Sequence, residues 1–204
     1  PVVETIARAH EVCPYQLAQD LLPWVDILVV DMHYVYSLTA GVGRLMAQDD
    51  RRWSVLLDEA HNLPERARDM YSAKLSKAEL MRVRRSSSPA VKRSLDKVNR
   101  AMLAVQKEDW GDEVFRDELP AELVNSLGDV VAAVGRAMAE DPRFVPANPE
   151  LMNFFFALLQ WLRVAENWGP EYRLQLRRGT GSQGLSLGLN CLDPSRMLAL
   201  CQAR

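Results

Sequence analysis

The chain has 204 residues, of which 48% are hydrophobic and 25% are charged, and its formal net charge is −2. This length and composition are those of a globular protein with one or two cores, and they exclude a disordered or low-complexity chain. Three widely spaced cysteines do not make a disulfide framework, which favours a reducing, cytoplasmic location. The most apolar stretch, Leu151 to Trp161, is too short and too polar to span a bilayer, so no membrane partner is expected.

The first part of the chain combines helical patterns with two short apolar runs. A helix is predicted from Val2 to Leu22, with a break at Cys13-Pro14. The apolar runs are Asp26 to Asp31 and Ser54 to Leu57, with a helix predicted between them from Leu38 to Met46. Strand, crossover helix and strand is the order of a parallel α/β unit, so both runs are predicted to be buried strands.

From about Pro64 the pattern is helical throughout. Ser76-Lys77-Ala78-Glu79 is a capping-box sequence, and Asn148-Pro149 opens a helix that runs to about Asn167 with an aromatic core face. Two helices between these starts each carry one narrow apolar stripe, which is typical of helices packed along their lengths. The stripes consist of Val91, Leu95, Val98, Met102 and Val105, and of Leu123, Leu127, Val130, Val134 and Met138.

Strand patterns return near the end of the chain. Apolar and polar residues alternate from Tyr172 to Leu176 and again from Leu185 to Leu189, which predicts a hairpin around the loop from Arg178 to Gly184. Asp193-Pro194 then opens a final helix. The predicted order is an α/β part, a mostly helical insertion and a return to β structure.

Charge is segregated within the helical insertion. Seven basic residues and one acidic residue lie between Arg82 and Arg100, whereas seven acidic residues and one basic residue lie between Glu108 and Glu122. Such segregation can hold an anionic polymer along one surface. The alternative, which is the commoner case for a run of charges, is a solvated helix face.

The segment Asp58-Glu59-Ala60-His61 directly follows the apolar run Val55-Leu56-Leu57. A buried strand that ends in two adjacent carboxylates is how nucleoside triphosphatases hold magnesium and aim a water at the γ-phosphate. We therefore expect Asp58 to bind Mg²⁺ through water, Glu59 to orient or deprotonate the attacking water, and His61 to sense the nucleotide state. The alternative is a solvated acidic turn after a strand.

No Gly-x-x-x-x-Gly-Lys-Ser/Thr phosphate loop occurs in the 204 residues. The glycines at Gly179, Gly181 and Gly184 lack the lysine and the strand-to-helix setting that such a loop needs. The chain is therefore expected to be a piece of a larger motor that does not hydrolyse ATP by itself.

Four segments together resemble the XPD-type and DinG-type DNA helicases, the iron–sulfur group of DEAH-box motors. They are Cys13-Pro14-Tyr15, Asp26 to Tyr34, Leu57 to Leu63, and Leu192 to Ser195. The resemblance implies part of a RecA-like α/β motor domain that is interrupted by a helical arch domain. It places residues 1–65 in the motor domain with the end of the iron–sulfur segment, residues 66–168 in the arch, and residues 169–204 back in the motor domain.

The resemblance implies a parent helicase that uses ATP, Mg²⁺ and a 4Fe-4S cluster. Cys13 matches the last cluster cysteine of the family, but Cys191 and Cys201 do not match the other three. A cluster takes four thiolates, so this chain is not expected to hold one stably. Without the family, the expectation for Cys13 is a buried free thiol.

The same resemblance implies single-stranded or forked DNA as the partner, threaded through a pore that the arch helps to frame. Such a pore needs cations along the phosphates, for which Arg84, Arg85, Lys92 and Arg93 are the candidates. The family also suggests movement from 5′ to 3′, a role in DNA repair, protein partners at the arch, and a place at the nucleoid if the source is bacterial.

Two other functions remain open on the residues alone. One is a non-catalytic helical interaction module in which the DEAH segment is a relic. The other is a metal-dependent nuclease that gathers Asp31, His33, Asp58 and Glu59 around one cation.

Overall fold

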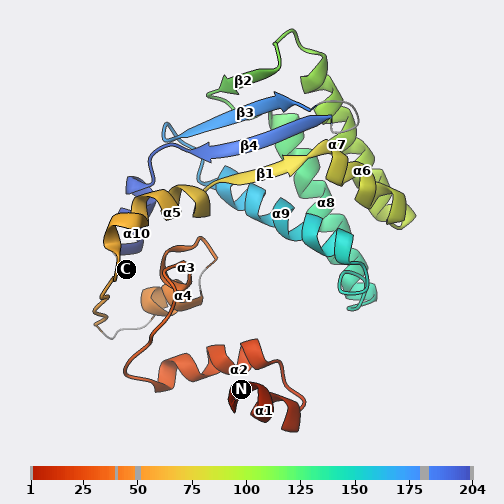
Figure 1. Cartoon of the computed structure of the whole chain (residues 1–204). Helices are drawn as coiled ribbons and strands as arrows, with labels where there is room; N and C mark the ends of the chain where they lie inside the picture. Colours follow the sequence, from red (N-terminus) through yellow and green to blue (C-terminus); the bar gives the residue numbers. More distant parts are fainter. Residues whose placement is uncertain (1, 40, 49–51, 180–183, 203–204) are drawn as a thin grey trace. The chain divides into compact units, whose positions relative to one another are not determined.

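A computed structural model describes residues 2–39, 41–48, 52–179 and 184–202 (Figure 1). The chain divides into two compact units, which we call unit 1, Pro1–Met70 with Ser195–Arg204, and unit 2, Tyr71–Pro194. The prediction of a helix-rich protein is confirmed. The strands of the described residues form one antiparallel sheet, and a RecA-like parallel sheet is not among them.

Unit 1 consists of short helices joined by irregular segments. The predicted break at Cys13-Pro14 is confirmed, because Cys13 precedes α2 and Pro14 is its first residue, where the missing N–H of proline costs no helical hydrogen bond. The helix predicted from Leu38 to Met46 is confirmed in part by α4, which begins at Gly41, and a further short helix, α3, precedes it. The elements are α1 (Val2–Ala9), α2 (Pro14–Leu21), η1 (Leu22–Trp24), α3 (His33–Tyr36), α4 (Gly41–Gln48), η2 (Ala60–Asn62), α5 (Leu63–Met70) and α10 (Ser195–Gln202).

The two buried strands predicted for unit 1 are wrong for this structure. Residues 25–31 and 52–57 contain no strand, and the side chains of Ile27, Val29 and Leu56 are 82%, 95% and 96% exposed. A central strand is stable only between neighbours that accept and donate its backbone hydrogen bonds and cover both its faces. The described part of unit 1 supplies no such neighbours, so the apolar pattern alone does not produce a strand.

Unit 2 is built on a sheet with the strand order β1-β4-β3-β2, and all neighbouring strands are antiparallel. The predicted hairpin is confirmed as β3 (Tyr172–Arg178) and β4 (Leu185–Cys191), with Leu174 opposite Leu189. The sequence did not predict β1 (Ala73–Ser76) or β2 (Glu113–Arg116), because four residues are too few to show a clear alternation. The hairpin lies in unit 2, whereas the sequence grouped it with the residues that follow it.

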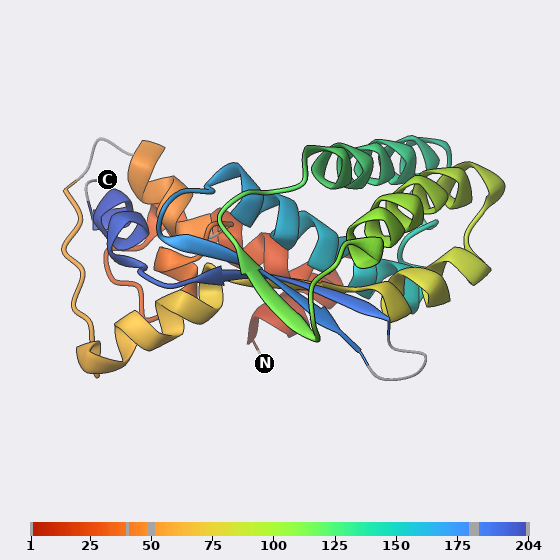
Figure 2. The same ribbon diagram turned by 90° about the horizontal axis from the view of Figure 1, so that it is seen from above.

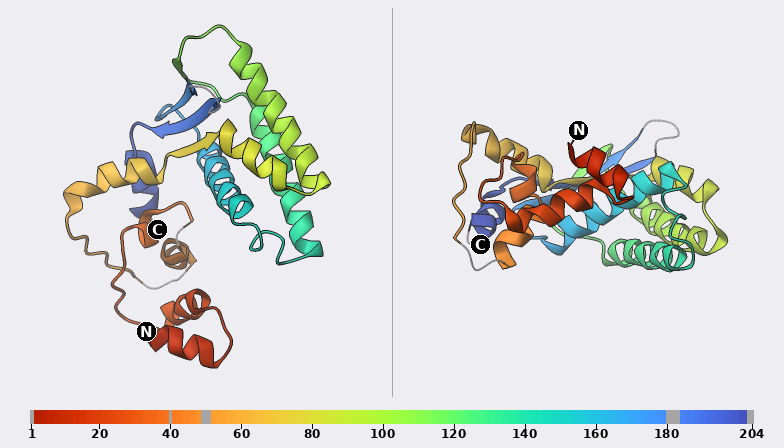
Figure 3. Two further views of the ribbon diagram at one scale, coloured as in Figure 1. Left: turned by 45° about the vertical axis from the view of Figure 1, so that its right-hand side comes forward. Right: turned by 90° about the horizontal axis from the view of Figure 1, so that it is seen from below.

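Four helices of unit 2 pack against one another and against one face of the sheet (Figures 2 and 3). They are α6 (Lys77–Ser86), α7 (Pro89–Lys107), α8 (Ala121–Glu140) and α9 (Pro149–Glu166). Helices α7 and α8 lie side by side, and the residues of both predicted apolar stripes are buried except the half-buried Met138. The aromatic core predicted for α9 is correct for Phe154 and Trp161 and wrong for Phe156, which is 61% exposed.

Local capping explains where two of these helices begin. The Ser76 hydroxyl accepts a hydrogen bond from the Glu79 backbone N–H and donates one to the Glu79 carboxylate, which confirms the predicted cap of α6. The Asn148 side-chain oxygen accepts a hydrogen bond from the Leu151 backbone N–H at 3.0 Å, which confirms the predicted cap of α9. Within the described residues, no helix has both the length and the apolar composition needed to cross a bilayer.

Replacing Asn148 with alanine is expected to lower the free energy of unfolding of unit 2 by about 1 kcal/mol, because the Leu151 N–H loses its acceptor. Urea denaturation followed by far-ultraviolet circular dichroism measures the change. Asn153→Ala is the matched control, since Asn153 is an exposed residue within the same helix. An equal loss in both variants would contradict the capping role.

Candidate functional site

Asp58, Glu59 and His61 lie on one exposed segment, in which Asp58 and Glu59 precede η2, His61 lies within η2, and α5 follows. The Asp58 carboxylate accepts a hydrogen bond from the Glu59 backbone N–H at 2.9 Å. The His61 Nδ1 atom lies 3.3 Å from Glu59 Oε2, and these two side chains are 73% and 67% exposed. The three residues are therefore together, but they do not follow a buried strand as the sequence predicted.

The backbone of Glu59 is unusual. Its φ of 51° and ψ of 40° are left-handed, a conformation that costs roughly 1–2 kcal/mol for a residue with a Cβ atom. The Glu59 carbonyl accepts a hydrogen bond from the Asn62 N–H at 2.9 Å, which closes the turn before α5. Residues held in sparsely populated backbone conformations are concentrated at functional sites. Glu11 also has a left-handed φ, of 53°, so it is the left-handed backbone together with two adjacent carboxylates that makes this turn the first candidate in unit 1.

The chemistry of this turn suits a magnesium–nucleotide complex. Mg²⁺ prefers oxygen ligands and is commonly held by one or two carboxylates together with substrate phosphates and water. Asp58 and Glu59 provide two adjacent carboxylates that are open to solvent. No group of three or more potential metal-ligating side chains occurs among the residues that the structure describes, so the turn by itself does not form a closed protein cage for a metal.

Asp31 and His33 form a separate, self-contained pair. The Asp31 carboxylate accepts a hydrogen bond from the His33 backbone N–H at 2.9 Å and lies 2.5 Å from His33 Nδ1. These contacts, the backbone one first, hold the pKa of Asp31 below its usual value. Since the described residues contain no three-ligand group, the arrangement gives no support to the four-residue nuclease site.

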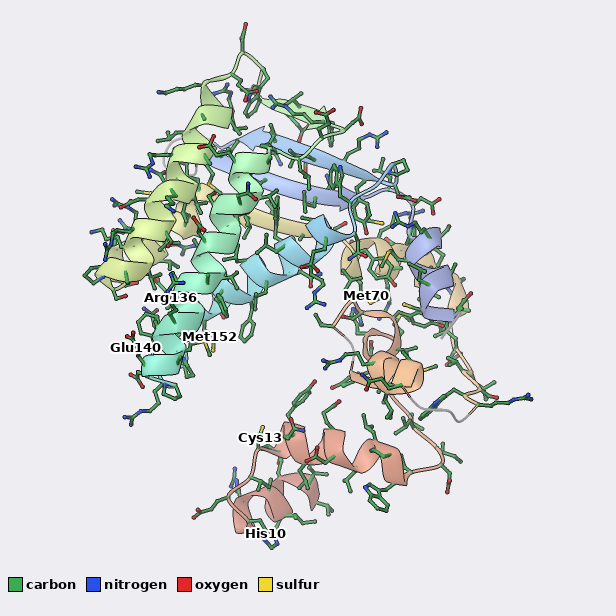
Figure 4. All side chains as sticks on the ribbon, turned by 180° about the vertical axis from the view of Figure 1, so that it is seen from behind. His10, Cys13, Met70, Arg136, Glu140 and Met152 are labelled. Carbon is green, nitrogen blue, oxygen red and sulfur yellow. The ribbon has the colours of Figure 1, made fainter. Side chains whose placement is uncertain are left out.

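The cysteines do not fit an iron–sulfur cluster. Cys13 is exposed at the start of α2 (Figure 4), so the expectation of a buried thiol was wrong. Cys191 and Cys201 are buried, the first in β4 and the second in α10. A cluster needs four thiolates, and the described residues bring no three ligating side chains together.

The four candidate DNA-binding cations differ in their surroundings. Arg84 forms an ion pair with Asp96, and both side chains are about one-third exposed, so this arginine ties α6 to α7. Arg85 and Lys92 are exposed, and Arg93 is exposed while donating from Nε to the Pro89 carbonyl. Arg85, Lys92 and Arg93 are thus the candidates whose charge faces solvent.

Comparison with known proteins shows what the first part of the chain is similar to. Residues 2–80 match the DEAD_2 family model. The ATP-dependent DNA helicase CHL1 of Candida glabrata is 36% identical to the chain over 81 residues. The resemblance to XPD-type and DinG-type helicases is confirmed. The DEAD_2 match includes Cys13 and the turn from Asp58 to His61 but ends in α6, and the similarity to CHL1 covers 38% of this chain and 10% of that helicase.

One set of polar residues, on the sheet of unit 2, was not predicted as a site from the sequence. Arg173, Gln175 and Arg177 alternate with buried residues along β3, and this alternation was visible in the sequence. The neighbouring Lys74 and Phe115 could not be placed beside them, because β1 and β2 were not predicted.

Proposed function

We propose that this chain is the part of an ATP-dependent DNA helicase that carries its DEAH segment and a helical arch. The observation that supports the proposal most is the DEAD_2 match over residues 2–80, because it includes Asp58, Glu59 and His61. The name of the similar protein from Candida glabrata, an ATP-dependent DNA helicase, supports the same activity.

In this proposal the turn from Asp58 to His61 serves ATP hydrolysis. Bound magnesium would supply charge that stabilises the phosphoryl group during transfer. Asp58 would hold that metal, and Glu59 orients the attacking water and accepts its proton. The contact of 3.3 Å between His61 and Glu59 provides a way for His61 to respond when the Glu59 carboxylate changes partner.

The exposed apolar side chains of unit 1 support a place in a larger α/β motor domain. Ile27, Val29 and Leu56 are each more than four-fifths exposed, although β-branched and leucine side chains are stabilised by burial. In the proposed RecA-like domain, neighbouring strands would pair with residues 26–31 and 54–57 and cover these side chains. Unit 2 would then be the arch, open to protein partners and to DNA under repair. We assign no step to the 4Fe-4S cluster.

The proposal is tested with the full-length protein. We expect Mg²⁺-dependent ATP hydrolysis that single-stranded DNA stimulates, together with unwinding of a forked duplex. Hydrolysis is measured by phosphate release and unwinding by the separation of labelled strands. Absence of ATP hydrolysis in the presence of DNA and Mg²⁺ would overturn it.

Reversing the charge of Arg85, Lys92 and Arg93 to glutamate is expected to weaken single-stranded DNA binding and its dependence on salt. Each lost phosphate contact should reduce the slope of log affinity against log salt concentration by about 0.7. Fluorescence anisotropy over a salt series measures the slope. Arg136→Glu on α8 is the control, because Arg136 is an exposed cation of the same unit outside α6 and α7. An unchanged slope in the triple variant would refute these contacts.

A second candidate is the non-catalytic interaction module. The observation that favours it is the exposure of Glu59 and His61 on a turn that no strand precedes. In that case the full-length protein neither binds nor hydrolyses ATP, and titration with a fluorescent ATP analogue distinguishes the two functions.

A further inference from the structure

The sheet of unit 2 has two chemically different faces. Along β3 the residues Tyr172, Leu174 and Leu176 are buried, whereas Arg173, Gln175 and Arg177 alternate with them. In Figure 1 the strands lie in front of α7, α8 and α9, and in Figure 4, seen from behind, these helices lie in front of the strands. The helices of unit 2 therefore pack on the leucine face. We call the other face the open face; its residues include Lys74, Phe115, Arg173, Gln175, Arg177 and Asn190.

Strand register arranges the open face in rows. Lys74 lies opposite Gly188, Gly188 lies opposite Gln175, and Gln175 lies opposite Phe115. With neighbouring strands about 4.8 Å apart, this row spans roughly 14 Å from Lys74 to Phe115. Arg177 lies two residues along β3 from Gln175, about 7 Å away on the same face. Lys74 thus lies at one end of this row and the Phe115 ring at the other, and Arg177 lies beside the middle of the row.

The middle of the open face is rich in hydrogen-bonding groups, which lie around the buried Gly188. Gly188 has no side chain, and a Cβ atom there would lie 3.0 Å from Gln175 Oε1, so a larger residue would crowd the amide. Asn190 Nδ2 donates to Gln175 Oε1 at 3.2 Å, and Gln175 Nε2 donates to Glu113 Oε1 at 2.7 Å. The Asn190 and Gln175 amides and the Glu113 carboxylate thus form a hydrogen-bonded chain across β4, β3 and β2.

Phe115 is the hydrophobic element of this arrangement. Its ring is 55% exposed on the edge strand β2, although burying a phenylalanine side chain is favourable by roughly 1.5–3 kcal/mol. An exposed aromatic ring on a sheet, flanked by amides and cations, is the arrangement on which single-stranded nucleic acids stack their bases.

Cations outnumber acids on the open face, where Lys74, Arg173 and Arg177 face Glu113 and Asp117. Asp117 pairs with Arg173 at 2.9 Å, while Glu113 accepts a hydrogen bond from Gln175, keeps its negative charge and lies opposite Arg177 in the register. Lys74 and Arg177 are exposed and have no ion-pair partner within the part of the chain that the structure describes. Protein interfaces have apolar centres, whereas the centre of this face is occupied by the amides of Gln175 and Asn190.

We propose that the open face of the unit 2 sheet binds single-stranded DNA, with a base stacked on Phe115 and phosphates held by Lys74 and Arg177. The proposal rests on the proposed helicase function for the identity of the ligand. It adds a base-stacking surface to the cations of α6 and α7. It also predicts a preference for unpaired strands, because a base inside a duplex cannot stack on a side chain.

The test uses the whole 204-residue chain and a fluorescein-labelled oligothymidine of about 20 nucleotides, with binding followed by anisotropy over a salt series. Phe115→Ala should weaken binding about tenfold, and Phe115→Tyr should restore it. Lys74→Gln combined with Arg177→Gln should lower the salt slope by about 1.4, since each phosphate contact contributes about 0.7. An abasic oligomer of equal length should bind Phe115→Ala as well as it binds the parent chain.

Matched control variants distinguish DNA binding at the open face from DNA binding elsewhere on unit 2. Phe156→Ala removes an exposed aromatic ring from α9, and Arg136→Gln removes an exposed cation from α8; neither should alter binding. Circular dichroism verifies that each variant is folded. The inference is overturned if the chain does not bind the oligomer, or if Phe115→Ala binds it as the parent does. In either case ATP hydrolysis by the full-length protein still decides the proposed function independently.

Discussion

Replacing Glu59 with glutamine in the full-length protein is expected to lower the kcat of DNA-stimulated ATP hydrolysis by at least about 100-fold, because general-base catalysis contributes about 10²–10⁴. The amide keeps the size of the carboxylate but cannot accept the proton of the attacking water. ATP binding should persist, because Asp58 remains to hold the metal. Phosphate release measures the rate, and a fluorescent ATP analogue measures the binding.

The structure makes this substitution easy to interpret. The Glu59 side chain is 67% exposed, and the turn is held by its backbone N–H, which donates to Asp58. Glutamine changes neither feature, so the folded state should be unaffected. Glu65→Gln is the matched control, because Glu65 is an exposed acid in the following helix, α5. A Glu59→Gln enzyme that hydrolysed ATP at the parent rate would show that this carboxylate is not the base.

The sequence predicted the fold of unit 2 better than that of unit 1. In unit 2 the periodic signal comes from contacts that the unit itself contains: Leu95 and Leu127 each lie on a stripe buried between paired helices, and Leu174 and Leu187 lie on paired strands. In unit 1 the apolar run at Val29 reflects a preference for burial that the described residues do not satisfy. Periodicity therefore predicts a structure only when the partners of the apolar face are present.

The candidate sites could likewise be predicted only where their residues are adjacent in the sequence. The DEAH segment is contiguous, so Asp58, Glu59 and His61 could be predicted as a group from adjacency alone. The open face is not contiguous, since Lys74, Phe115 and Arg177 come from three strands whose register is set by pairing. Arg84 was assigned to DNA from charge alone, but its ion pair with Asp96 depends on how α6 and α7 pack.

Trp161→Ala is expected to lower the free energy of unfolding of unit 2 by about 3–5 kcal/mol, which is a large part of the stability of a small domain. Trp161 is fully buried in α9, the helix that packs against β1, β4, α6 and α8, so its removal opens a cavity in the core of unit 2. Hydrogen exchange of the β3–β4 peptides measures the loss within unit 2 itself. Phe156→Ala on the same helix removes an exposed ring and should change stability by no more than about 0.5 kcal/mol.

Trp161→Phe separates packing from hydrogen bonding at the same position. The Trp161 Nε1 atom is buried without a hydrogen-bond partner among the described residues, and an unsatisfied buried donor costs roughly 1–3 kcal/mol. Phenylalanine removes that donor while it keeps one aromatic ring, so the two effects oppose each other, and the net loss should stay below about 2 kcal/mol. A loss as large as that of Trp161→Ala would mean that the indole nitrogen does have a partner in solution, since the lost ring volume alone does not account for it.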